Sequence, residues 1–325
     1  MRWSGRALMG LALFAASPAA AFDCNKAATA AEKAICGDPL ARAADAAMAA
    51  AFSKRHASEN PTGKRTLVAA QGLWLKARDR DCMDAKPLGA CLAEQSARRR
   101  AYLAGEPEAG PGAPGRLAPV VRIESGSKSK ADINLQLLKY PAAATPAERA
   151  FNAGVEAQVG DLDEPEAGDP SPEGYAHERT MRLIYASPAL ISAHLWAYDD
   201  TGGAHPNTFS GDVNILVAQG REATFADLLD GRGAKAVFAL CLKQVIAAKK
   251  ARMGADAPVR PDYINELTKE VVEATGKLNA SSFAADKATV SYDPYAVGAY
   301  AEGAYACLIP YATLKPLAKP GFPLP

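Results

Sequence analysis

Gly105-Glu-Pro-Glu-Ala-Gly-Pro-Gly-Ala-Pro-Gly115 is the stretch that divides this chain of 325 residues and decides its architecture. It holds four glycines and three prolines in eleven residues and has no apolar period, which is the composition of a flexible-to-extended linker. The segments on its two sides follow different hydrophobic patterns. We therefore expect a domain over residues 22–104, a linker over 105–115 and a second domain over 116–325.

The segment before the linker is predicted to be helical. Asp38-Pro39 provides an N-cap followed by proline at the first helical position, and residues 40–52 carry one apolar stripe at helical spacing. Further helices are expected from about Thr62 and over residues 88–103. A bundle of this size has a thin core, so covalent cross-links are expected to hold it.

Residues 1–21 have the pattern of a signal peptide. Arg2 and Arg6 precede an apolar run over residues 7–15, and Ala19-Ala20-Ala21 supplies the small residues that a signal peptidase needs. The run is shorter than the roughly 20 residues that span a bilayer, and no later segment reaches that length without charges. We predict a periplasmic or secreted protein that begins near Phe22 and has no membrane span.

The six cysteines fit an oxidising compartment. Cys24 and Cys36 are twelve residues apart and Cys82 and Cys91 nine apart, so pairing between neighbours is favoured, although four cysteines allow three connectivities. Cys241 and Cys307 remain as a third pair. The spacing lacks the short Cys-x-x-Cys unit and the nearby histidines of a zinc site, so no metal is expected there.

The first domain resembles a known family. Phe22-Asp-Cys24 through Cys36, the Gln71–Asp79 segment and the Arg98–Leu103 segment are similar to the LprI-type lysozyme-inhibitor domain. The resemblance implies a secreted helical domain with two disulfides that inhibits lysozyme. Trp74 and Arg78 lie one helical turn apart and are candidate contact residues; alternatively, Trp74 belongs to the core and Arg78 bonds a neighbouring carboxylate.

The segment after the linker predicts an α+β domain with a mainly antiparallel sheet, so the chain as a whole is α+β. A helix is expected from Thr145 to Val159, and longer helices over 234–252 and 261–275. Strands are expected over residues 120–124, 133–138, 179–185, 190–198 and 212–217. Three short strands, near residue 282 and over 288–292 and 304–309, are expected to finish the sheet.

Two motifs in the second domain resemble a further family. Gly202-Gly-Ala-His205-Pro206-Asn207, and Tyr292 through Tyr300 followed by Ile309-Pro-Tyr311, are similar to the domain of the DUF3298 type in RsiV-type anti-sigma factors and PdaC-type deacetylases. RsiV-like proteins bind lysozyme directly, so the resemblance implies a lysozyme-binding role. The catalytic domain of the deacetylases has no counterpart in the sequence.

Catalytic chemistry is not predicted. His194, His205, Asp199 and Asp200, with His177 nearby, are the groups that a metal hydrolase would use. His194, however, lies on a strand, and His205 lies in a turn where Gly202 and Gly203 supply positive φ while His205 and Asn207 bond the backbone. The nucleophile motif Gly-x-Ser-x-Gly, a phosphate loop and a basic nucleic-acid stripe are absent from the sequence. We expect no catalytic residue, metal, cofactor or nucleic-acid partner.

Binding through a loop is favoured instead. Asp293, Pro294, Tyr295 and Tyr300 form a turn-rich loop, and tyrosine gives a large contact area at low entropy cost. Lysozymes use two carboxylates in a groove, which an inserted loop would block. Alternatively, Tyr292 and Tyr300 pack under the sheet and only the loop tip is exposed.

Charge is distributed unevenly along the chain. Residues 22–104 carry 14 Lys and Arg against 9 Asp and Glu (net +5), and residues 105–325 carry 21 against 27 (net −6). The acidic segment 161–173 would attract a cationic lysozyme, or else is only a solvated loop. The sequence predicts a protein that binds and inhibits, or senses, a lysozyme or similar muramidase. A peptidoglycan-binding module and, last, a metal hydrolase are the alternatives.

Overall fold

The structure is a computed structural model that describes residues 23–127, 130–160, 162, 174–254 and 261–325. The expected signal peptide, and the acidic segment 161–173 apart from Leu162, lie outside these residues. None of the helices described is both long and apolar enough to cross a bilayer.

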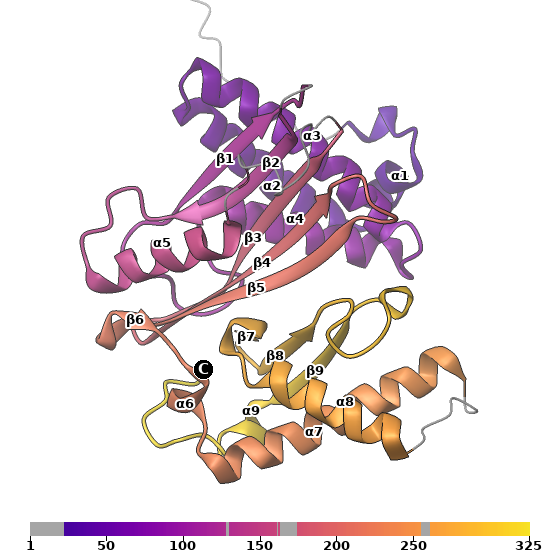
Figure 1. The fold of residues 1–325 in the computed structure, drawn as a ribbon. Coiled ribbons are helices and arrows are strands. Elements are labelled where there is room, and N and C mark those ends of the chain that lie inside the picture. Colours follow the sequence, from indigo (N-terminus) through magenta and orange to yellow (C-terminus); the bar gives the residue numbers. More distant parts are fainter. Residues whose placement is uncertain (1–22, 128–129, 161, 163–173, 255–260) are drawn as a thin grey trace, which may run out of the picture.

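The first part of the chain folds into four helices. They are α1 (Ala30–Gly37), α2 (Pro39–Ser58), α3 (Pro61–Cys82) and α4 (Leu88–Ala104), preceded by a short 3₁₀ turn at Cys24–Lys26 (Figure 1). Thr29 and Glu32 form a capping box at the start of α1. Asp38 accepts hydrogen bonds from two amides of α2, and Pro39 is the first residue of that helix, as the sequence predicted. We call residues 23–104 the helical module.

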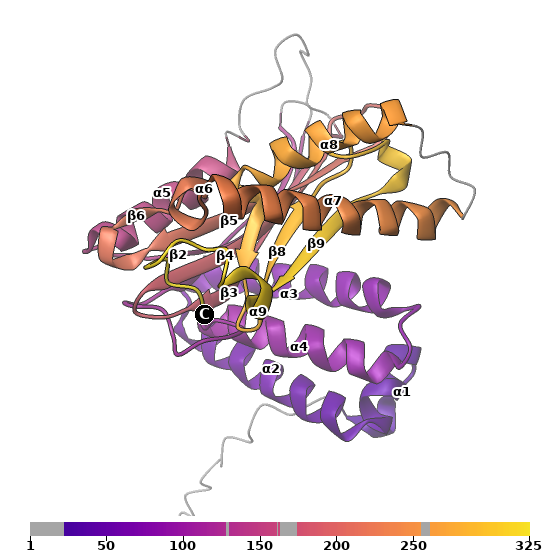
Figure 2. The same ribbon diagram turned by 90° about the horizontal axis from the view of Figure 1, so that it is seen from below.

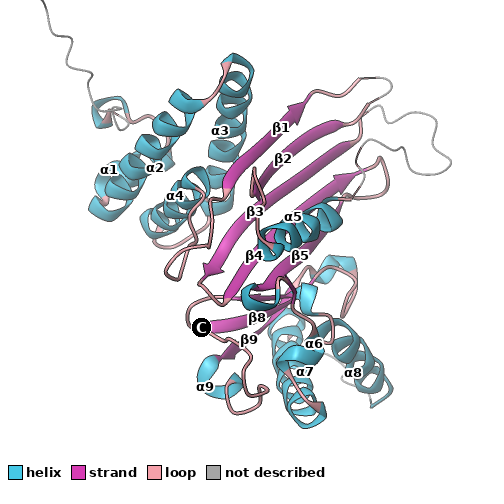
Figure 3. Ribbon diagram, turned by 90° about the vertical axis from the view of Figure 1, so that its left-hand side faces the viewer, coloured by secondary structure: helices cyan, strands magenta, loops and turns pink. Residues whose placement is uncertain are grey.

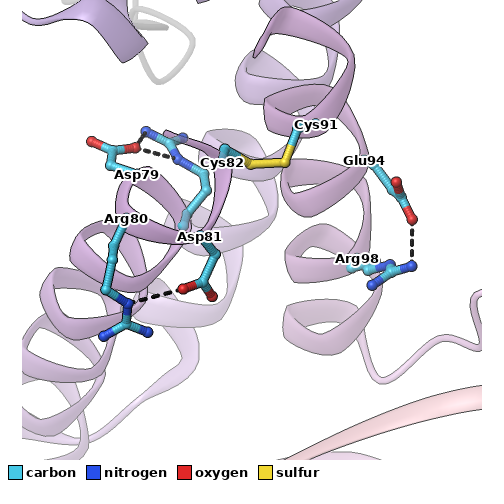
Figure 4. The surroundings of a disulfide bond; sticks show 8 residues. Asp79, Arg80, Asp81, Cys82, Cys91, Glu94 and Arg98 are labelled. Atoms are coloured by element: carbon cyan, nitrogen blue, oxygen red, sulfur yellow. Dashed lines mark hydrogen bonds and ion pairs between the residues drawn. A yellow bond between two sulfur atoms is a disulfide. The ribbon is translucent and has the colours of Figure 1, made fainter. Parts of the chain in front are cut away.

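Two disulfides cross-link the helical module. Cys24 bonds Cys36, and Cys82 bonds Cys91, so the pairing of neighbours is confirmed. The Cys82–Cys91 disulfide joins α3 to α4 (Figure 4), and Cys82 is fully buried with Leu92 in a small core of its own. The cross-links thus compensate for a core too thin to hold α1 and the end of α3 alone.

A six-stranded sheet follows, in the order of the chain. Its strands are β1 (Ala118–Glu124), β2 (Asp132–Lys139), β3 (Ala176–Ala186), β4 (Leu190–Asp200), β5 (Asn207–Leu216) and β6 (Arg221–Glu222). All neighbours are antiparallel except β2 and β3, which the helix α5 (Pro146–Val159) connects as a parallel pair. The expectation of an α+β fold with a mainly antiparallel sheet is confirmed.

The two faces of this sheet differ in character. Helix α5 packs on one face, where a Cβ added at Gly154 would lie 2.9 Å from Val213 (Figure 3). That face is apolar and carries Met181, Leu195 and Val213 in the main core. The opposite face carries the alternate residues of β3, β4 and β5, which are largely polar.

The helical module packs on the polar face of the sheet at its β1–β2 end. Arg99 of α4 donates a hydrogen bond to Gln71 of α3 (3.0 Å) and another to Gln136 of β2 (2.5 Å). Met48 and Leu67 of the module share one core with residues of the sheet. The two predicted domains are therefore in close contact.

The segment 105–115 lies against β3 and is hydrogen-bonded to it. The amide of Glu108 donates to the carbonyl of Leu183 (2.8 Å), and that of Ala109 to the carbonyl of Ile184 (3.0 Å). Its Gly- and Pro-rich composition predicted a flexible-to-extended linker. The extended backbone is present, but the segment is held in place because its amides donate to carbonyls of β3 beyond the part of β3 that pairs with β2.

The remaining elements form a second, smaller layer. Helices α6 (Phe225–Leu228), α7 (Gly231–Met253), α8 (Pro261–Thr275) and α9 (Tyr311–Leu314) surround the strands β7 (Ser281–Phe283), β8 (Lys287–Tyr292) and β9 (Tyr305–Pro310). Figure 2 shows α7 and α8 on the side of β8 and β9 that faces away from α3 and α4. The expectation that these short strands finish the main sheet is wrong, because β7–β9 form a separate three-stranded sheet.

The small layer is fixed internally and to the main sheet. Cys241 of α7 bonds Cys307 of β9, which confirms the third predicted disulfide. The buried amide of Asn214 on β5 donates to the carbonyls of Leu278 (3.1 Å) and Ser281 (2.7 Å). The small sheet thus covers the polar face at the end opposite to the one that the helical module covers.

Candidate functional site

Two loops that are 90 residues apart in sequence meet at one edge of the molecule. The first connects β4 to β5 and holds Gly202–Asn207, and the second connects β8 to β9 and holds Asp293–Tyr300. His205 of the first loop contacts both Tyr295 and Tyr300 of the second. The structure therefore brings together the two motifs that the sequence singled out separately. We call these two segments the paired loops.

His205 organises this contact. Its ring stacks on Tyr300 with the centroids 3.6 Å apart and the planes 11° apart. Its Nδ1 lies 3.0 Å from the carbonyl oxygen of Pro206, which can only accept, so Nδ1 carries the proton. In the neutral imidazole Nε2 is then the acceptor, and it receives the hydroxyl of Tyr295 at 3.0 Å.

The base of the second loop is anchored to the sheets. Asp293 accepts hydrogen bonds from the amide (2.9 Å) and the hydroxyl (2.8 Å) of Ser210 on β5. Tyr292 is buried, and its hydroxyl lies 2.6 Å from that of Thr275. Tyr300 is half-buried and donates to the carbonyl of Pro206 (2.7 Å). Tyr292 and Tyr300 are therefore structural, while Tyr295 at the tip of the loop is exposed.

Tyr295 is the side chain that this arrangement presents to solvent. It is 61% exposed, and its φ of 73° is positive. Among the residues that the structure describes it is the only non-glycine with positive φ. A bulky residue in this region costs about 1–3 kcal/mol, and such strain persists where neighbouring contacts impose it, commonly at binding sites.

The first loop turns at one glycine and not at two. Gly202 has a φ of 76°, and its amide donates to Asp200 (3.1 Å), whereas Gly203 has no positive φ. His205 bonds the loop backbone as expected. Asn207 instead begins β5, where it pairs with Asp199. The expected role of Gly203 is corrected because only Gly202 has positive φ, and that of Asn207 because it belongs to the strand and not to the turn.

The histidines considered for a metal site are separated. His177 pairs with Asp199 (2.6 Å), His194 pairs with Asp212 (2.9 Å), and His205 is held by the two tyrosines. Within the described part of the chain no three His, Cys, Asp or Glu side chains are close enough to hold one ion. Burial is the main influence on Asp212 and raises its pKa, which the bond from His194 partly offsets.

Trp74 and Arg78, the candidate contact residues of the helical module, point inwards. Arg78 is only 5% exposed and pairs with Asp45 (3.1 Å) and Asp79 (2.8 Å). Trp74 is half-buried against the main core, with the guanidinium of Arg78 5.2 Å from its ring centre. A contact surface that includes the Arg78 guanidinium is therefore wrong, because its donors are already paired and hidden from solvent.

Other charges of the module do face solvent near the second disulfide. Arg80 pairs with Asp81 at 2.9 Å, and Arg98 pairs with Glu94 across one helical turn (Figure 4). Arg80 and Asp81 are both more than half exposed. Pairs of this kind contribute little to stability, so these residues are available for other contacts.

Comparison with known proteins matches part of the chain to a family. Residues 24–121 match the family model described as "Lysozyme inhibitor LprI". The match covers the helical module, the 105–115 segment and the start of β1, and it supports a lysozyme-inhibitor-like or binding role. No curated protein matches the chain.

Two solved structures are similar to the chain. A member of the DUF3298 family from Bacteroides fragilis is 13% identical, with 63% of this chain and 93% of that chain covered at a TM-score of 0.45. A DUF3298 family protein from Pseudomonas aeruginosa is 20% identical, with 65% of this chain and 97% of that chain covered at a TM-score of 0.43.

Proposed function

We propose that this protein is exported, binds a lysozyme-type muramidase, and inhibits it by placing the Tyr295 loop in the substrate groove. The observation that carries the proposal is Tyr295 itself: an exposed tyrosine at positive φ that is hydrogen-bonded to His205 of the first loop. Tyrosine at the tip of a preformed loop is a strong binding residue, because little conformational freedom remains to be lost.

The family match supports the same kind of partner. The matched segment, residues 24–121, packs on the main sheet, which carries the loop of His205, and His205 in turn contacts the Tyr295 loop of the small sheet. Inhibition by occupying the substrate groove needs no reaction, cofactor or metal from this chain. The three disulfides fit an oxidising compartment outside the cytosol.

The groove of a lysozyme offers a suitable target. Such enzymes hold two carboxyl groups in a cleft that must stay open to a glycan chain. A loop that fills the cleft excludes substrate whether or not it touches the carboxyl groups. The anchors at Asp293 and Tyr300 keep the loop base fixed, so that Tyr295 projects as a rigid wedge.

Three variants test the role of Tyr295. Tyr295→Ala removes the ring and should weaken binding to lysozyme by about 30-fold, which corresponds to the roughly 2 kcal/mol of an interface hot spot. Tyr295→Phe keeps the ring and loses only the bond to His205, so its effect should be smaller. Leu308→Ala is the matched control, since Leu308 is a large apolar side chain, 46% exposed, on the separate strand β9.

Titration calorimetry and the muramidase rate give the two measurements. The proposal expects Tyr295→Ala to lose affinity and inhibition together, while Leu308→Ala keeps both. Equal affinity of Tyr295→Ala and the unmodified protein would contradict the placement of the contact at this loop. Absence of binding by the unmodified protein would contradict the proposed function itself.

A further inference from the structure

The polar sheet face around Trp196 lies between the part that the helical module covers and the part that the small sheet covers. Here Thr180, Trp196 and Ser210 lie side by side on β3, β4 and β5, and Glu178, Tyr198 and Thr208 form the next row. The module covers the face at Gln136, and the small sheet covers it at Asn214. Between these covers, Trp196 is 37% exposed.

Two aromatic rings form a platform on this part of the polar sheet face. Trp196 and Tyr198 are two residues apart on β4, so their side chains leave the same face of the sheet. Their ring centres are 6.2 Å apart and their planes are 30° apart, which makes a nearly continuous surface. Tryptophan and tyrosine each combine an apolar face with a polar hydrogen-bonding group.

The polar groups around the platform have no partner within the described residues. No side-chain hydrogen bond is made by Glu178, Thr180, Trp196, Tyr198 or Thr208, although all but Trp196 are half-buried. Burial is the largest influence on Glu178 and raises the pKa of its carboxyl group. Half-buried donors and acceptors without partners are the groups that a polar ligand would satisfy.

The platform lies between the end of α3 in the helical module and the paired loops. Arg80 and Asp81, at the end of α3, act electrostatically on Glu178, and Tyr300 of the paired loops acts on Tyr198. The charges of both signs near Glu178 offset each other, which suits an uncharged ligand better than a strongly ionic one. A protein interface, by contrast, has an apolar centre from which charged groups are depleted.

We propose that this face binds an oligosaccharide chain. Pyranose rings have apolar C–H faces that would stack on Trp196 and Tyr198, and their hydroxyl groups would bond the unpaired Glu178, Thr180 and Thr208. This saccharide site adjoins the paired loops, since Asp293 bonds Ser210, but it does not include Tyr295.

Fluorescence titration with chitotetraose and cellotetraose tests the proposal directly. Beyond Trp3 in the predicted signal peptide, Trp74 and Trp196 are the only tryptophans of the chain. At least one tetrasaccharide should change the emission, and Trp196→Phe should remove the change while Trp74→Phe retains it. Trp196→Ala should raise the dissociation constant at least tenfold, and Tyr198→Phe should raise it less.

The two proposed sites are distinguished by crossing the variants and the ligands. Tyr295→Ala should keep the saccharide affinity and lose lysozyme inhibition, whereas Trp196→Ala should do the reverse. The saccharide site is refuted when neither tetrasaccharide binds at millimolar concentration, or when Trp196→Ala binds as well as the unmodified protein. A loss of lysozyme binding in folded Trp196→Ala would also overturn it, since a protein partner would then cover the face.

Discussion

Arg99 is predicted to be the residue on which the contact between the helical module and the sheet depends most. It is 3% exposed, and within the described residues no carboxylate pairs with it. Its guanidinium bonds the side-chain oxygens of Gln71 and Gln136 and lies 5.0 Å from the ring centre of Tyr102. Burial lowers the pKa of Arg99 to about 10, so it is still charged at neutral pH.

The effect of Arg99→Ala follows from what the substitution leaves behind. Gln71 and Gln136 are both buried, and each would keep an oxygen without a donor, at about 1–3 kcal/mol apiece. The lost packing of the Arg99 side chain on Tyr102 adds to this loss of stability. We expect the free energy of unfolding to fall by about 3–5 kcal/mol, the range seen when a buried polar cluster loses its central member.

Urea denaturation followed by circular dichroism measures this difference. Arg99→Met is the companion variant, and combined with Gln71→Leu and Gln136→Leu it should recover most of the loss, because an apolar cluster leaves no acceptor unpaired. The neighbouring Arg100, which is exposed and pairs with Glu106, is the control, and Arg100→Ala should change stability by less than about 1 kcal/mol. A loss below about 1 kcal/mol in Arg99→Ala would refute the reasoning.

Three further predictions concern the disulfide and two carboxylates. Replacing Cys241 and Cys307 together by alanine should lower the unfolding free energy by about 4 kcal/mol, since the bond closes a loop with a sequence separation of 66; denaturation of the variant and of the unmodified protein, both without reductant, measures it, and an unchanged midpoint would contradict it. Hydrogen bonding lowers the folded pKa of Asp227, so its contribution should be present at neutral pH and disappear as the pH falls below about 4; in Asp227→Asn this acid-dependent loss should be smaller, and an identical pH profile would oppose the assignment. Burial raises the folded pKa of Asp212, so its ionisation should cost stability increasingly as the pH rises above about 4; the unfolding free energy of Asp212→Asn should therefore rise relative to that of the unmodified protein as the pH increases from about 4, and a relative fall would contradict the assignment.

Features set by neighbouring residues could be predicted from the sequence. The capped start of α2, the helix that begins after Thr145 and the neighbouring disulfides all depend on residues a few positions apart. The α+β class also follows from local hydrophobic periods. The pairing of Cys241 with Cys307 followed once the other four cysteines were assigned.

Features set by distant contacts could not be predicted in the same way. Nothing local distinguishes β7–β9 as a separate sheet, or β2 and β3 as a parallel pair across α5. The inward position of Arg78 depends on Asp45, 33 residues earlier. The paired loops show the same limit: each motif was visible, but their meeting through His205 and Tyr295 depends on how two sheets pack.

The platform around Trp196 was also missed, although a signal for it exists. Trp196 and Tyr198 alternate with Leu195 and Ala197 on one strand, a pattern that places both rings on the face away from the core. The sequence does not reveal whether another element covers that face. Trp196 is exposed because the helical module and the small sheet contact the face on either side of it.

The rate of glycan hydrolysis by lysozyme, measured while the protein lacking residues 1–21 is titrated in, tests the proposed function most directly. Binding by contact predicts that turnover falls to a plateau near one equivalent at nanomolar concentrations, and that mass spectrometry finds both proteins intact afterwards. Unchanged turnover, together with no heat of binding at micromolar concentrations, would contradict it.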